Sequence, residues 1–130
     1  MMKRIARIAC ACLIAMPLCA AAVGTIGSRP PPMTCTTGPV TRTYGKTQWL
    51  VYSCQDFKSI VVVSAPGSPA APFYFRGNVK ADGSYQFDGA GTGSKSATDA
   101  AYAELKLLSP KDIAALVSAT RGVAASATTR

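Results

Sequence analysis

The 130-residue sequence predicts an α+β fold. We expect a four-stranded antiparallel meander followed by two C-terminal helices that pack on one face of the sheet, with one disulfide. Three observations predict it. Four runs rich in branched and aromatic residues come first, turn-forming residues separate these runs, and two segments with apolar residues at helical spacing follow. Strands that precede helices, rather than alternate with them, are typical of this class.

Residues 1–22 are predicted to be a secretory signal peptide. Three basic residues precede an apolar run at 8–18, and small residues stand at 20–22. The run is shorter than the roughly 20 residues that span a bilayer, so no stable membrane anchor is expected after cleavage. We therefore expect the mature chain to be periplasmic or secreted.

The mature chain is predicted to have three parts. Residues 23–34 contain three consecutive prolines and would form a flexible leader. Residues 35–122 would form a single domain. Residues 123–130 would be a frayed tail, because Arg121 and Gly122 are typical of a helix end.

Removal of the signal peptide leaves two of the five cysteines, Cys35 and Cys54. Two cysteines in an exported chain predict one disulfide, which would stabilise the fold by roughly 3 kcal/mol for a loop of about 19 residues. A reactive thiol pair is the alternative, but the Cys-x-x-Cys spacing typical of such pairs is absent.

The first two strands are predicted within residues 47–54 and 60–65. The second is apolar at consecutive positions, so both of its faces are expected to be covered, as in a central strand. Trp49, the only tryptophan, is expected in the core rather than in a binding site.

The third and fourth strands are predicted to form a hairpin with a defined register. A three-residue turn at 81–83, with its glycine as a G1 bulge, places Val79 opposite Tyr85 and keeps the apolar residues on one face. In this register Arg76 faces Asp88, and we expect an ion pair between them.

Helix starts are predicted at Ser96 and Ser109. Ser96 is followed by Asp99, while Ser109 is followed by Pro110 and Asp112. A capping hydroxyl with an acid three residues later is typical of a helix N-terminus, and proline is favoured at the first helical position.

The composition argues against an enzyme. The chain has no histidine, so it lacks the most common general base and metal ligand. Of its six acids, only Asp56 and Glu104 lack a predicted structural task, and nothing brings them together as glycoside hydrolysis would require. No Ser-x-x-Lys motif and no metal-ligand spacing occurs. We therefore predict no catalytic residue, no metal and no cofactor.

One candidate binding site is the glycine-rich segment before the first helix. It differs from a Walker A loop because Ser94 separates the last glycine from the lysine. Free amides at a helix start could still hold an anion. This candidate anion site comprises Gly91, Gly93, Ser94 and Lys95, and a plain glycine-rich turn is the alternative.

The other candidate is the polar face of the third strand, which carries Tyr74, Arg76, Asn78 and Lys80. Tyrosine and arginine are favoured at protein interfaces, so these residues form a candidate interaction face. The alternative is an ordinary solvated side of the sheet.

Charge and predicted export define the expected function. Fourteen Lys and Arg stand against six acids, and removal of three basic residues with the signal peptide leaves a net charge of +5. This charge favours anionic partners, although it also serves solubility. We predict a small exported, non-enzymatic binding or accessory protein of the bacterial cell envelope. Its expected partner is a protein or an anionic envelope glycan, and no nucleic acid partner is expected.

Two alternatives stay open. A minimal periplasmic hydrolase would need a Lys or carboxylate base, such as Lys46 or Asp56, near the glycine-rich segment. A secreted protein inhibitor would instead present the loop at residues 65–72 to its target.

Overall fold

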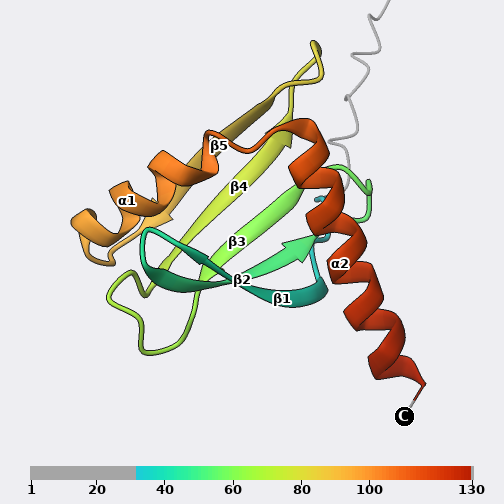
Figure 1. Ribbon diagram of the computed structural model, residues 1–130, viewed down its shortest axis with the longest axis horizontal. Helices are drawn as coiled ribbons and strands as arrows, with labels where there is room; N and C mark the ends of the chain where they lie inside the picture. The colour runs from blue at the N-terminus through green and yellow to red at the C-terminus, as the bar shows by residue number, and fades with distance from the viewer. Residues whose placement is uncertain (1–31, 130) are drawn as a thin grey trace, which may run out of the picture. The chain divides into compact units, whose positions relative to one another are not determined.

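In a computed structural model, which describes residues 32–129, the chain forms one antiparallel sheet and two helices (Figure 1). Five strands follow one another across the sheet in chain order, and both helices follow the last strand. The α+β class, the meander and the two C-terminal helices are therefore confirmed. The predicted signal peptide and most of the predicted leader lie outside the described residues. The elements are β1 (Thr37–Tyr44), β2 (Thr47–Ser53), β3 (Ile60–Ser64), β4 (Phe73–Val79), β5 (Tyr85–Gly91), α1 (Lys95–Leu105) and α2 (Pro110–Thr128).

The strand β1 is an addition to the four that the sequence predicts. Its residues are mostly small or polar, and only Val40 and Tyr44 are buried in it, so it shows no clear alternation. Its pairing with β2 is irregular between Thr37 and Val40. The strand forms because β2 supplies an edge and α2 packs on it, a case in which tertiary contacts override local preference.

The core lies between one face of the sheet and the two helices. Trp49 and Val51 of β2 are fully buried, and Val51 pairs with Val62 of β3. The predicted place of Trp49 in the core is thus confirmed. From the helices, the same core cluster takes Ala101, Leu105, Ile113, Leu116 and Val117.

The hairpin of β4 and β5 has the predicted register. Val79 pairs with Tyr85, and Gly83 has a φ of +84° in the turn. Arg76 lies opposite Asp88, but the ion pair expected between them does not form. Asp88 accepts instead a hydrogen bond of 3.3 Å from the side chain of Gln86, its neighbour on the same face of β5.

The strand β5 continues to Gly91, into the glycine-rich segment that the sequence places before the first helix. A Cβ atom at Gly89 would lie 2.6 Å from the ring of Phe73 and 2.8 Å from that of Phe75. The glycines therefore make room for these rings, a requirement that depends on the paired strand and not on the local sequence.

The helix α1 begins two residues earlier than predicted, with Ser94 rather than Ser96 at the N-cap position. The side chain of Ser94 makes no capping hydrogen bond, and Asp99 forms an ion pair of 2.7 Å with Lys95 one turn earlier. Both side chains of this pair are largely exposed, so it contributes little to stability.

The helix α2 has the predicted start but a later end. Ser109 and Asp112 form a capping box, with Pro110 as the first helical residue. The predicted stop at Gly122 is wrong, because the helix continues to Thr128. A glycine inside a helix lowers its stability by about 1 kcal/mol, which the continuing helical hydrogen bonds can offset. The stretch predicted to be a frayed tail is therefore mostly helical.

Candidate binding face

The face of the sheet opposite the core carries no helix of the described chain. Tyr52 of β2 pairs with Val61, Leu50 pairs with Val63, and Val63 also pairs with Tyr74 of β4. These side chains point away from the core because side chains alternate along a strand. They are half-buried, and Tyr74 is 41% exposed. We call the surface formed by Leu50, Tyr52, Val61, Val63 and Tyr74 the open face.

The open face corrects one prediction about β3. Ile60 and Val62 are buried under the helices, whereas Val61 and Val63 are only half-buried on the other side. β3 is the central strand as expected, but the described chain covers only one of its faces with helices. A contiguous, partly exposed apolar patch is typical of a surface that contacts a partner.

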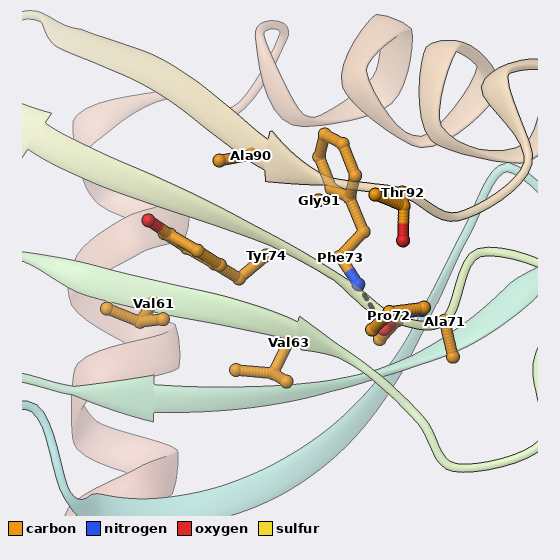
Figure 2. Close-up of a pocket in the computed structure, with 10 residues that line it drawn as sticks. Val61, Val63, Ala71, Pro72, Phe73, Tyr74, Ala90, Gly91 and Thr92 are labelled. Atoms are coloured by element: carbon orange, nitrogen blue, oxygen red, sulfur yellow. Dashed lines mark hydrogen bonds between the residues drawn. The ribbon is translucent and has the colours of Figure 1, made fainter.

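A groove of about 520 Å³ lies on the open face (Figure 2). Tyr74 lies between Ala90 on one side and the side chains of Val61 and Val63 on the other. None of the lining residues in the described part of the chain is charged. One end of the groove is anchored by a hydrogen bond of 3.0 Å from the Phe73 backbone to Ser64 Oγ. The other lining residues are Ala71, Pro72, Gly91 and Thr92.

A second hollow, of about 390 Å³, adjoins the groove at Val61. We call it the disulfide hollow, because Cys35 and Cys54 line it and are joined by the predicted disulfide, with an S–S distance of 2.02 Å. Of the described residues that line it, only Arg76 is charged. The remaining lining residues are Pro32, Met33, Ile60 and Asn78.

The structure places most of the predicted interaction face on the open side of the sheet. Tyr74, Arg76 and Asn78 are exposed, and alternation along β4 turns them to the same side. Tyr74 lines the groove, and the other two line the disulfide hollow. Lys80 follows the strand, and its backbone N–H donates to the carbonyl of Ser84 at 2.7 Å within the turn.

Sequence reasoning missed the contribution of Val61 and Val63 to this face. A run of consecutive apolar residues is typical of a strand covered on both sides. The pattern therefore did not indicate that alternate residues of β3 are partly exposed. The polar outer residues of β4 were an available signal. Because neighbouring strands share their faces, a solvent-facing side of β4 implies a solvent-facing side of β3.

The residues of the predicted anion site are near one another, but the N–H groups and the ammonium that would hold an anion have partners within the fold. Gly91 pairs with Phe73 in the sheet. The backbone N–H groups of Gly93 and Ser94 donate to carbonyls of the preceding loop at 3.2 and 2.9 Å, and the Lys95 ammonium pairs with Asp99. A Cβ atom at Gly93 would lie 1.8 Å from the carbonyl oxygen of Ala70, so close packing accounts for this glycine. An anion here would have to compete with these contacts.

The groups considered for a hydrolase are not brought together. Lys46 lies in the turn before β2, whereas Asp56 lies in the turn after it. The seven residues of β2 separate these turns by roughly 20 Å. Within the described range, no group of three potential metal-ligating side chains occurs. No helix in that range is long and apolar enough to cross a membrane.

Asp56 has a structural task that the sequence did not reveal. Its carboxylate accepts hydrogen bonds from the backbone N–H groups of Lys58 and Ser59, at 3.0 and 2.8 Å, and from the Ser59 hydroxyl at 2.6 Å. Burial would raise the pKa of Asp56, but these hydrogen bonds outweigh it and hold the pKa below its usual value of 3.8. The carboxylate therefore stabilises the turn between β2 and β3.

Replacing Asp56 by alanine is expected to lower the free energy of unfolding by about 1 kcal/mol at neutral pH, because the turn loses these hydrogen bonds. The pKa of the carboxyl is lower in the folded chain than in the unfolded chain. The carboxylate therefore contributes its full stabilisation at pH values above the pKa of the unfolded chain. This stabilisation is lost as the pH falls through the pKa of the folded chain. Urea unfolding of wild type and Asp56→Ala at neutral and acidic pH measures this. A difference in stability that does not shrink below about pH 3 would contradict the assignment.

Comparison with known proteins gives no match to a family model, a curated protein or a solved structure. The function must therefore be argued from the open face itself.

Proposed function

We propose that this protein is a small exported, non-enzymatic binding protein of the bacterial cell envelope that holds its partner on the open face. The observation that carries the proposal is the uncharged groove on that face, with Tyr74 at its centre and Arg76 beside it. A half-exposed tyrosine and arginine next to an apolar surface are typical of interaction sites. The disulfide supports export, because such bonds persist mainly outside the cytoplasm.

The chemistry of the groove favours an apolar contact over an anionic glycan. A glycan needs many hydrogen-bond donors and acceptors, whereas the groove is lined mainly by aliphatic and aromatic side chains. A hydrolase has less support because Asp56 and Lys46 lie at opposite ends of β2. An inhibitor has less support because the loop at 65–72 is partly inserted in the fold, with Ala70 fully buried.

Two tyrosines with equal exposure allow a matched test. Tyr74 on the open face and Tyr102 on α1 are each 41% exposed. The protein would be produced with its own leader, recovered from the periplasm and immobilised over an envelope extract and over purified wall glycan. Its recovery from the periplasm also tests export.

Tyr74→Ala is expected to reduce retention of the envelope component about tenfold, while Tyr102→Ala leaves it unchanged. Quantitative mass spectrometry of the retained material measures both. If Tyr74→Ala and Tyr102→Ala reduce retention of the envelope component equally, the proposal is overturned. Retention of wall glycan that does not depend on Tyr74 would also overturn it. Circular dichroism establishes that both variants are folded.

A further inference from the structure

We propose that the open face binds one fatty acid, with its hydrocarbon chain in the groove and its carboxylate at Arg76 and Asn78 in the disulfide hollow. The inference rests on the proposed function and specifies the ligand of the same face. The observation behind it is that the uncharged groove adjoins the disulfide hollow at Val61. The guanidinium of Arg76 lines that hollow.

The groove suits a hydrocarbon chain better than a peptide. A peptide carries backbone donors and acceptors along its whole length, and burying them without partners costs free energy. The backbone N–H and C=O groups of β3 and β4 at the groove already take part in the pairing of these strands, where Val63 pairs with Tyr74. A hydrocarbon needs no such partners, and about 520 Å³ is within the range of small-molecule sites.

The charge beside the groove favours a carboxylate. Arg76 lies opposite Val61 in the sheet and two residues from Tyr74 on the same face of β4. Two residues along a strand span roughly 7 Å, so a chain lying on Tyr74 can place its end at the guanidinium. Among residues 32–129, Arg76 is the only charged residue that lines either hollow, and its planar group matches a carboxylate. The Asn78 amide can donate a further hydrogen bond.

The shape favours a single molecule over a membrane surface. A bilayer would contact residues that protrude, whereas Val61, Val63 and Tyr74 line a hollow of about 520 Å³. Asp88 lies opposite Arg76 on β5, and its negative charge would be repelled by an anionic membrane.

The test uses the disulfide-intact protein from the periplasm, with laurate as the probe and titration calorimetry as the readout. Dodecylammonium is expected to bind at least tenfold more weakly, because it brings a cation to Arg76. Shortening the acid to decanoate and octanoate is expected to weaken binding about tenfold for each two carbons. Equal affinity for the anion and the cation would overturn the proposal.

Three substitutions separate the two parts of the site. Arg76→Gln is expected to weaken the binding of laurate about tenfold and to leave the binding of dodecanol unchanged. Tyr74→Ala is expected to weaken the binding of both. Asp88→Asn is expected to tighten laurate binding about threefold, because it removes the negative charge opposite Arg76, which would repel the carboxylate of laurate. The matched control is Arg42→Gln, since Arg42 lies opposite Trp49 on the helix side of the sheet. An Arg76→Gln variant that binds laurate as tightly as wild type would overturn the proposal.

Failure of this inference is distinguishable from failure of the proposed function. If laurate does not bind but an envelope protein is retained in a Tyr74-dependent manner, the fatty acid is excluded and the binding role stands. If the protein forms a dimer that buries Tyr74 and excludes laurate, the ligand assignment is wrong. If neither laurate nor any envelope component depends on Tyr74, both proposals fail.

Discussion

Replacing Trp49 by alanine is expected to lower the free energy of unfolding by about 4 kcal/mol, the typical cost of removing a large aromatic side chain from a core. The indole is fully buried, and its ring centroid lies 5.3 Å from that of Phe75. Its Nε1–H donates to the Tyr44 carbonyl at 3.0 Å and to Thr47 Oγ1 at 3.1 Å. The substitution leaves a cavity and removes the donor to both oxygens.

Urea unfolding followed by far-ultraviolet circular dichroism measures this loss, since the only tryptophan is gone from the variant. Small domains have a total stability of about 5–15 kcal/mol, so the variant would be close to unfolding. Trp49→Phe is the matched comparison, because it keeps an aromatic ring in the core while it removes the N–H donor and part of the indole volume. It is expected to cost about half as much. A loss below about 1 kcal/mol in Trp49→Ala would contradict the place of Trp49 in the core.

Removing the disulfide by the double substitution Cys35→Ser and Cys54→Ser is expected to cost about 3 kcal/mol. The bond closes a loop with a sequence separation of 19, and it restricts the unfolded chain more than the folded one. It also holds the segment before β1 next to β2, where the Gln55 N–H donates to the Thr34 carbonyl at 2.9 Å. Both effects stabilise the same end of the sheet.

Thermal unfolding with and without a reductant measures this contribution. The wild-type protein should lose stability when reduced, and the double variant should not respond. A wild-type chain whose melting temperature is the same in both conditions would show that the bond contributes nothing to the folded state. A reductant effect that persists in the double variant would show that another process is responsible.

Features that depend on neighbouring residues were predicted well from the sequence. The register of the β4–β5 hairpin follows from side-chain alternation and a short turn, and Val79 lies opposite Tyr85 as expected. The capping box at Ser109 and Asp112 also follows from four adjacent residues. In such cases the interacting groups are close in the chain, so their spacing is enough to predict the contact.

Features that depend on distant residues were not predicted. The strand β1 forms against β2 and α2, and its own residues give little indication of a strand. The ion pair between Arg76 and Asp88 was expected from register alone, although the rotamers of two exposed side chains are not set by register. For the candidate site, the residues of β4 were predicted, while Val61 and Val63 were not.

The sequence by itself determined the class of the fold, the disulfide partners, the hairpin register and the polar side of β4. Each of these follows from composition or from the spacing of residues close along the chain. Only the tertiary structure decided that β1 adds a fifth strand and that half of each apolar strand remains outside the core. The physical reason is that burial depends on which elements meet in space. A strand that is apolar on both sides has the same sequence pattern whether other elements cover one of its faces or both.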